Sequence, residues 1–193
     1  MLEIKDLSKS YGDKSVLCDI SFSAKTNDRI VIMGGSGCGK TTLLRIIAGL
    51  ESYDGGTVDT NGERIALMFQ EPRLLPWKNA IDNVRVPLGA DKAHIADKYL
   101  EAVELSLKTD GKKMPRELSG GMKQRVALAR FLAYAEVSDA SILLLDEPFS
   151  ALDDDTADKM LALLKSFSEN KILLVVTHNE KHAESLGSKV IRL

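Results

Sequence analysis

The chain has 193 residues, of which 44% are hydrophobic and 28% charged, the balance of an ordinary globular domain. Its formal net charge of −2 argues against a protein that holds nucleic acid by bulk charge. Two cysteines, Cys18 and Cys38, form no disulfide framework and fit a reducing compartment. No apolar run approaches the roughly 20 residues that span a bilayer, and no signal peptide is visible. We expect a cytoplasmic globular protein.

Three short strands are expected near the beginning of the chain. Residues 2–7 largely alternate between apolar and polar side chains, and residues 16–23 do so again after a turn at Gly12-Asp13. Residues 30–33 form a continuous apolar run, which is typical of a buried parallel strand. The strand at 30–33 therefore predicts a sheet with both faces covered.

A glycine-rich turn separates this strand from a predicted helix at residues 40–50, where leucine and isoleucine recur at helical spacing. Glycines and an asparagine then bracket residues 55–62, which favours a hairpin-like stretch. Residues 71–117 differ in character, because they hold four of the five prolines and a charged, helical segment around 91–108. We expect this region to be an inserted, mostly helical lobe.

The second half of the chain alternates between helices and strands. A helix is predicted at 120–134 and an amphipathic one at 153–167, with apolar strands at 142–145, 171–176 and 189–193. Such alternation predicts an α/β fold with a mainly parallel sheet. We expect one domain over residues 1–193, with the N-terminal strands as an antiparallel subdomain and the helix at 120–134 joined to the helical lobe.

The glycine-rich turn fits the P-loop pattern, which is a glycine, four residues, and then Gly-Lys-Thr. Glycines let successive backbone N–H groups converge on phosphate oxygens, and the helix that follows adds its positive N-terminal end. Lys40 is expected to neutralise the β- and γ-phosphates, and the Thr41 hydroxyl to ligate Mg²⁺. Cys38 has two open interpretations, a redox role or an inert small filler. The candidate phosphate site comprises Gly34, Gly35, Ser36, Gly37, Cys38, Gly39, Lys40, Thr41 and Thr42.

Two acidic residues follow the apolar strand at 142–145. Ligands of open α/β sheets bind at the carboxyl ends of the strands, so Asp146 is a candidate Mg²⁺ ligand. Glu147, one residue further on, is a candidate general base for an attacking water. Two solvated acids at a strand end are the alternative, which the upstream P-loop makes the weaker one.

The stretch Leu118-Ser119-Gly120-Gly121-Met122 narrows the class of P-loop protein to which the chain can belong. It resembles the signature of the ABC (ATP-binding cassette) family, which most often has glutamine where this chain has Met122. The Ser119 hydroxyl and the amides of Gly120 and Gly121 at a helix start suit a second anion site. The resemblance implies that this site contacts the γ-phosphate held by the P-loop of another subunit. A serine-capped helix after a turn is the alternative.

Other positions match the same family in chain order. The resemblance implies that Tyr11 stacks on adenine, that Gln70 senses Mg²⁺ and the attacking water, and that His178 contacts the γ-phosphate. Residues 150–153 match the D-loop, which crosses the dimer interface in the family. A surface tyrosine at a strand end remains an alternative for Tyr11. The other two histidines, His94 and His182, are expected to be structural.

The resemblance covers the whole chain and implies an ATP-hydrolysing transporter subunit that dimerises around two ATP molecules with Mg²⁺. The implied partners are a second ATPase subunit, in a homodimer by expectation, and integral membrane permease subunits, with no nucleic acid. Such a subunit is cytoplasmic and lies on the inner face of the membrane through its partners. The cargo and the choice between homodimer and heterodimer stay open.

The segment that follows Gln70 suggests a subfamily. Its Leu-Leu-Pro-Trp string, residues 74–77, resembles importer ATPases for nitrate, sulfonates, taurine and thiamine-type substrates. In the family this region receives the coupling helix of the membrane subunit, so Leu74 and Trp77 are candidate contacts; a buried hinge is the alternative. The chain is shorter than most such subunits, and the missing segments bear on partner docking more than on ATP chemistry.

Three rival classes of ATPase or kinase share parts of this pattern. ATPases of chromosome maintenance or DNA repair share the signature but carry long coiled coils, and residues 42–117 show no sustained heptads. ABC-type ATPases of iron–sulfur assembly, translation or export complexes are only weakly disfavoured. A P-loop kinase for small molecules gives no role to the Ser119 helix start or to His178.

Overall fold

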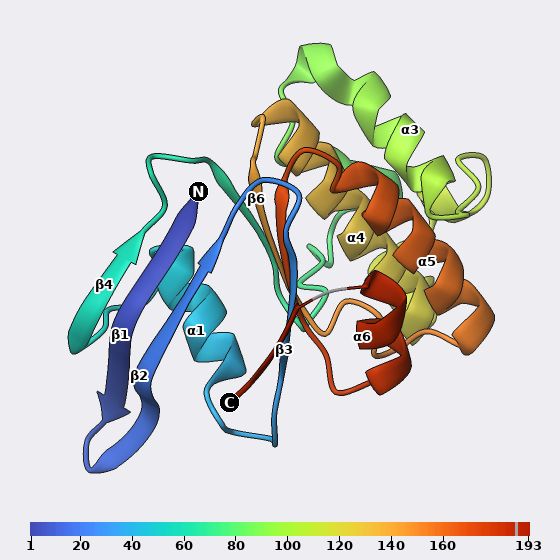
Figure 1. Ribbon diagram of the computed structural model, residues 1–193. Helices are drawn as coiled ribbons and strands as arrows, with labels where there is room; N and C mark the ends of the chain where they lie inside the picture. The colour runs from blue at the N-terminus through green and yellow to red at the C-terminus, as the bar shows by residue number, and fades with distance from the viewer. Residues whose placement is uncertain (188) are drawn as a thin grey trace. The chain divides into compact units, whose positions relative to one another are not determined.

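The structure is a computed structural model that describes residues 1–187 and 189–193. These residues form two compact units, which are taken in turn (Figure 1). The first unit comprises Met1–Leu67, Ala140–Glu147 and Ser168–Leu193, and the second comprises Met68–Asp139 and Pro148–Phe167. The helical lobe expected from sequence lies in the second unit, which also contains the amphipathic helix predicted at 153–167.

A three-stranded antiparallel sheet begins the first unit, as predicted. Strand β1 (Leu2–Tyr11) is its centre, with β2 (Lys14–Ala24) on one side and β4 (Gly55–Asp59) on the other. Both predicted strands are longer than expected, because the tight turn at Gly12-Asp13 lets them pair up to Tyr11 and Lys14.

The second sheet of this unit has the predicted parallel character. Its order is β5-β6-β7-β3-β8, and the pairs β6–β7, β7–β3 and β3–β8 are parallel. The strands are β5 (Ile65–Met68), β6 (Ile142–Asp146), β7 (Ile172–Val176), β3 (Arg29–Met33) and β8 (Lys189–Arg192). Strands β6 and β7 are buried at every position, which explains their continuous apolar runs.

The expected hairpin at residues 55–62 is wrong. Strand β4 pairs with β1 in the antiparallel sheet, whereas β5 joins β6 in the parallel one. The two strands differ in burial: β4 is exposed at Gly56, Thr57 and Asp59 and half-buried at its other two positions, while β5 is apolar and half to fully buried. The Asn61-Gly62 turn therefore passes the chain between two sheets, because each strand finds a partner that matches its own burial.

Helix α1 (Lys40–Ile47) supplies the apolar cover for this unit's core. Leu43, Leu44, Ile46 and Ile47 are all buried on it, as the helical spacing predicted. The helix ends earlier than residue 50, because Gly49 adopts a left-handed φ of 70°. A short helix that was not predicted, α6 (Glu180–Leu186), is capped by Asn179. One core cluster joins both sheets to α1; it includes Leu2, Ile4, Leu7, Leu17, Ile30, Ile32, Leu43, Leu44, Ile142, Leu144, Leu174 and Val176.

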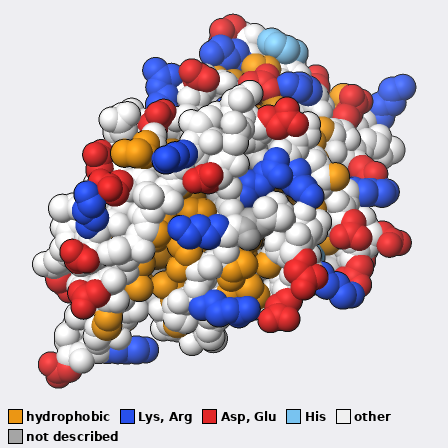
Figure 2. Space-filling view, viewed as in Figure 1, with side chains coloured by type: hydrophobic (Ala, Val, Ile, Leu, Met, Phe, Trp, Pro, Cys, Tyr) orange, Lys and Arg blue, Asp and Glu red, His pale blue; other side chains and the backbone are white. Residues whose placement is uncertain are grey.

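The second unit is helical. It holds α2 (Ala80–Arg85), α3 (Ala93–Ala102), α4 (Gly120–Val137) and α5 (Asp154–Phe167), with 3-10 turns at Ala90–Lys92, Asp110–Lys112 and Pro115–Glu117. Helix α4 packs against α2 and α3, and the rings of Tyr99 and Phe167 meet edge to face with centroids 5.8 Å apart. Figure 2 shows acidic and basic side chains interspersed on the face in view.

Candidate functional site

The P-loop lies between the buried strand β3 and helix α1 in the first unit. Gly39 caps the helix with φ of 102°, a left-handed value that favours glycine. A Cβ built on Gly39 would lie 2.8 Å from both Val16 O and Leu17 Cδ2. The loop therefore packs against strand β2 with no room for a side chain. Thr42, the last predicted phosphate-site residue, is the third residue of α1.

Lys40 is folded back into the loop. Its Nζ donates hydrogen bonds to the carbonyl oxygens of Gly34, at 2.9 Å, and Gly35, at 2.7 Å. The same ammonium lies 3.7 Å from Cys38 Sγ. These carbonyls hold the Lys40 ammonium at the point where the P-loop meets the N-terminus of α1. Phosphate oxygens would bind the ammonium more strongly, because their hydrogen bonds are charge-assisted.

Asp146 ends strand β6 beside the start of α1. Its Oδ2 accepts a 2.6 Å hydrogen bond from Thr41 Oγ1, and the residue is only 4% exposed. Burial raises the pKa of Asp146, and the Thr41 hydrogen bond and the nearby Lys40 and Arg45 charges only partly offset this. The pair offers two hard oxygen ligands, and Mg²⁺ in nucleotide sites is commonly held by one or two protein oxygens together with phosphates and water. The residues fit the ion.

Glu147 directly follows and has an unusual backbone. Its φ is 47°, a conformation that is costly for a non-glycine residue and recurs at functional sites. Its N–H donates to Val176 O at 3.0 Å, which fixes the residue against the end of β7. The side chain is 11% exposed and its Oε1 lies 2.9 Å from His178 Nδ1. A nearly buried carboxylate is thus held by a histidine that is itself 71% exposed.

Tyr11 is the last residue of β1 and is 48% exposed. It pairs with Lys14 across the hairpin turn, and Lys9 pairs with Leu17. Because Leu17 and Val16 contact the Gly39 position, the hairpin that carries Tyr11 is packed against the end of the P-loop. The first unit thus gathers the P-loop, Asp146, Glu147, His178 and the Tyr11 hairpin.

The signature residues lie in the second unit, at the start of α4. Ser119 is the N-cap, and its Oγ accepts from Met122 N at 3.2 Å, as predicted for a capped helix start. Gly120 is exposed, and a Cβ there would meet nothing within 4 Å. A Cβ on Gly121 would lie 3.0 Å from Ala151 O. The start of α4 therefore touches the segment 150–153 that was expected to be the D-loop.

Gln70 also lies in the second unit, two residues after β5, and is exposed. The structure shows two further contacts there that the sequence analysis missed. Gln124 Nε2 donates to Pro148 O at 3.1 Å, and Arg130 donates to the carbonyls of Pro72, at 2.6 Å, and Arg73, at 3.0 Å. Polar side chains on the largely buried helix α4 were the only sequence signal of these contacts. Their partners are 24 to 58 residues away in sequence, so local patterns could not identify them.

The two histidines expected to be structural differ in burial. His182 is buried in α6, and its Nε2 lies 3.4 Å from Asn179 Nδ2. His94 is exposed on α3, so a structural role for it stays a prediction. Trp77 is 70% exposed, so it is not the buried hinge that was its alternative reading.

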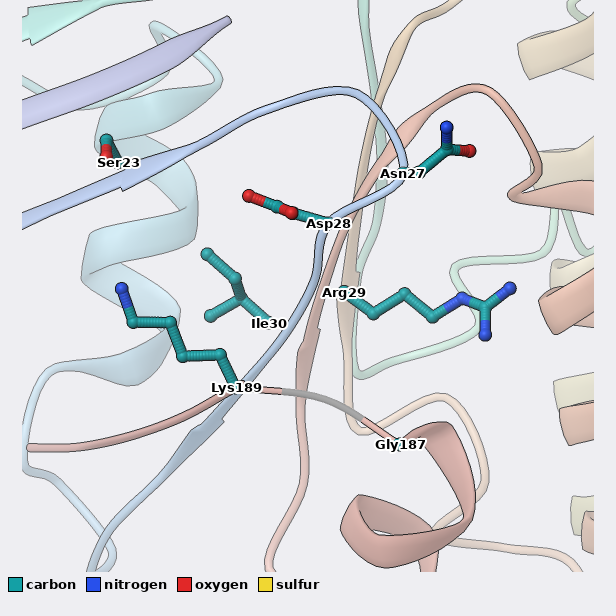
Figure 3. Close-up of a pocket in the computed structure, with 7 residues that line it drawn as sticks. All are labelled: Ser23, Asn27, Asp28, Arg29, Ile30, Gly187 and Lys189. Carbon is teal, nitrogen blue, oxygen red and sulfur yellow. The ribbon is translucent and has the colours of Figure 1, made fainter.

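A pocket of about 270 Å³ lies at the opposite end of β3 from the P-loop (Figure 3). It contains none of the predicted site residues; its lining is Ser23, Asn27, Asp28, Arg29, Ile30, Gly187 and Lys189. Across the described parts of the chain, no helix is both long and apolar enough to cross a bilayer.

Comparisons with known proteins agree with this geometry. The ABC transporter family model matches residues 17–150. The aliphatic sulfonates import ATP-binding protein SsuB 2 of Xanthomonas axonopodis pv. citri is 42% identical over 100% of this chain and 67% of its own length. SsuB 1 of Shouchella clausii is also 42% identical, over 98% of this chain and 75% of its own.

Among solved structures, the dimeric ATP-binding cassette MJ0796 in a post-hydrolysis state, bound to ADP and Pi, superposes with a TM-score of 0.88 and 32% identity. That match covers 100% of this chain and 94% of the other. A second dimeric structure of the same cassette gives a TM-score of 0.87. The chain therefore belongs to the ABC transporter family, as an ATP-binding subunit that hydrolyses ATP.

Proposed function

We propose that this ATPase drives solute import, with aliphatic sulfonates as the cargo class, as one half of a dimer bound to membrane permease subunits. The observation that carries the ATP chemistry is the cluster in the first unit, where Lys40, the Thr41–Asp146 pair and the Glu147–His178 pair meet. Relatives named as sulfonate import subunits support the direction and the cargo over the rival classes.

ATP binding begins at the P-loop. Lys40 exchanges the carbonyls of Gly34 and Gly35 for the β- and γ-phosphates, and the loop amides and the start of α1 add positive potential. Thr41 and Asp146, which share a hydrogen bond, would hold Mg²⁺. Bound Mg²⁺ neutralises charge on the phosphates. Tyr11 stacks on the adenine.

Hydrolysis is assigned to Glu147. Its carboxylate orients a water and accepts the water's proton as the oxygen–γ-phosphorus bond forms. The bond from the γ-phosphorus to the β–γ bridging oxygen breaks in the same step, which releases ADP and phosphate. His178 holds that carboxylate at 2.9 Å, and because its ring is largely exposed, the ring can also reach a γ-phosphate. Asp146 contacts Thr41, whereas Glu147 contacts His178, so the two neighbouring acids are assigned different tasks.

The site is completed by a second copy of the chain. Ser119 caps α4, and a Cβ on Gly120 would meet nothing within 4 Å among the described residues, so the exposed start of α4 offers its hydroxyl and amides to an anion. Facing the γ-phosphate of the other subunit gives these groups a ligand. The dimeric cassettes that this chain resembles support this arrangement.

The membrane partner docks on the segment after Gln70. Trp77 is a large apolar side chain that is mostly exposed, which is common at contact surfaces. Through this contact the ATPase lies on the inner face of the membrane.

Isolation of the intact complex from membranes tests the proposal. A permease should co-purify, and its reconstituted complex should hydrolyse ATP faster with an alkanesulfonate and its binding protein than with nitrate or sulfate. A complex that lacks an integral membrane protein would contradict the transport role. Stimulation by nitrate alone would contradict only the cargo.

A further inference from the structure

Lys9 is a buried cation two residues before Tyr11. Its side chain is 7% exposed, although lysine is among the residues least often buried without a partner. In a strand, residues i and i+2 lie on the same face, so Lys9 and Tyr11 share one face of β1. Lys9 Nζ lies over the Tyr11 ring, 5.0 Å from its centroid, within the range of a cation–π interaction.

The ammonium is held by the segment that follows α1. It donates to Ser52 Oγ at 3.2 Å and lies 3.6 Å from Glu51 Oε1 and 3.8 Å from Asp54 Oδ1. Two acidic side chains around one buried cation offset the free energy of removing it from water.

The same segment is fastened to the backbone of β1. Asp54 Oδ2 accepts from Ser10 N at 2.6 Å, and Asp54 N donates to Ser8 O at 2.9 Å. The segment after α1 therefore bonds to the Lys9 side chain and to the backbone of its two neighbours in β1, Ser8 and Ser10.

This arrangement joins the two halves of a nucleotide site. Helix α1 begins with Lys40 and Thr41, the residues proposed to bind the phosphates and Mg²⁺, and residues 51–54 follow its end at Ile47 after a short turn. Lys9 connects those residues to the Tyr11 ring. Tyr11 is 48% exposed, so the residue keeps exposed surface for a base while the cation lies over its ring. A cation on one face holds the ring and polarises its π electrons.

We propose that Lys9 is a positioning residue for the nucleotide base, acting through Tyr11 by fixing and polarising the ring on which the base stacks. This inference rests on the proposed adenine contact of Tyr11. In this proposal Lys9 does not contact the phosphates. Lys9 therefore affects the affinity only for ligands that carry a base.

The test compares two ligands that share the phosphates and differ in the base. Affinities for ATP and for inorganic tripolyphosphate are measured by calorimetry without Mg²⁺, so that hydrolysis does not interfere. Lys9→Met should weaken ATP binding about five-fold and leave tripolyphosphate binding unchanged. Lys9→Arg, which keeps the cation, should restore most of the ATP affinity. Lys5→Met, at an exposed lysine of the same strand, is the matched control and should change neither affinity.

A double-mutant cycle with Tyr11→Leu separates the possible failures. In the Tyr11→Leu background, Lys9→Met should have no further effect on ATP affinity. An equal loss in both backgrounds, or an equal loss for tripolyphosphate, overturns the role of Lys9 while leaving that of Tyr11 intact. If Tyr11→Leu binds ATP as tightly as the unsubstituted chain, the adenine contact is wrong and the Lys9 proposal fails with it.

Thermal unfolding of each variant shows whether it is folded, because Lys9→Met leaves Glu51 and Asp54 without their cation. Should it not fold, Glu51→Gln replaces it in the same cycle. That variant removes one partner of Lys9 and should weaken ATP binding about two-fold relative to tripolyphosphate. Equal affinities with and without this substitution would overturn the proposal.

Discussion

Thr41 Oγ1 and Asp146 Oδ2 are 2.6 Å apart, although 105 residues separate them in sequence. The contact joins the first turn of α1 to the end of β6, and it places a buried acid where Mg²⁺ is proposed to bind. Burial raises the pKa of Asp146 despite the nearby Lys40 and Arg45 charges, so the charged carboxylate is disfavoured at this position.

Asp146→Asn should therefore stabilise the nucleotide-free chain while abolishing Mg²⁺-dependent hydrolysis. An acid whose pKa is raised on folding favours the folded state at pH values below its unfolded pKa, and this contribution is lost as pH rises through the folded value. The variant should melt a few degrees higher at pH 7, and the difference should shrink toward pH 4. Thermal scans over this range check it; a variant that melts lower at pH 7 would contradict the assignment of burial as the dominant cause.

Glu147→Gln should keep ATP affinity but lower the rate of hydrolysis by roughly 10²–10⁴-fold, the usual contribution of a general base. Because the γ-phosphate then persists, the variant should accumulate as an ATP-bound dimer. Steady-state ATPase assays and gel filtration with and without MgATP measure both effects. Turnover at the unsubstituted rate would remove Glu147 from this role.

His178→Ala should reduce kcat by roughly ten-fold or more with a smaller change in KM. The reason is the 2.9 Å contact with Glu147, which would no longer hold the carboxylate. His182→Ala is the matched control at a histidine of the same unit outside the cluster, and its kcat should stay near that of the unsubstituted chain once equal folded protein is compared. Equal kcat values for both variants would argue against a special role of His178.

The two signature glycines allow a comparison of stability with activity. Gly120→Ala adds a methyl group that meets nothing in its own chain, so it should raise the free energy of unfolding by up to about 1 kcal/mol through helix propensity. It should nevertheless lower ATPase activity roughly ten-fold or more, because the methyl group enters the space expected for the other subunit's phosphate. Gly121→Ala should instead lower stability, since its Cβ would lie 3.0 Å from Ala151 O. Denaturant unfolding measures the stability of both variants, and ATPase assays measure their activity. Full activity in Gly120→Ala would count against the shared site.

Local patterns predicted the parts of the structure that depend on neighbouring residues. The P-loop, the Ser119 cap and the apolar strands each follow from a few adjacent side chains, and all appear where expected. The hairpin at 55–62 was wrong because the choice of strand partner depends on the burial of the whole sheet. Helix α6 was missed because it has only seven residues, too few for a periodic signal.

Polar residues with distant partners could not be predicted. The apolar pattern was clear in the elements that carry Lys9, Gln124 and Arg130. The neighbouring sequence nevertheless gives no indication of the hydrogen-bond partners of these residues. The positive φ of Glu147 could not be predicted either, because the backbone there is hydrogen-bonded to Val176 in a neighbouring strand.

Mixing two inactive variants tests the central claim most directly. Lys40→Ala removes the phosphate-binding cation, and Ser119→Asp keeps a good helix cap while placing a negative charge against the phosphate. Each variant alone should be nearly inactive. If Ser119 of one chain completes the site over Lys40 of another, a mixture should regain ATPase activity, since mixed dimers contain one intact site. A mixture that forms mixed dimers and stays as inactive as its components would contradict the account.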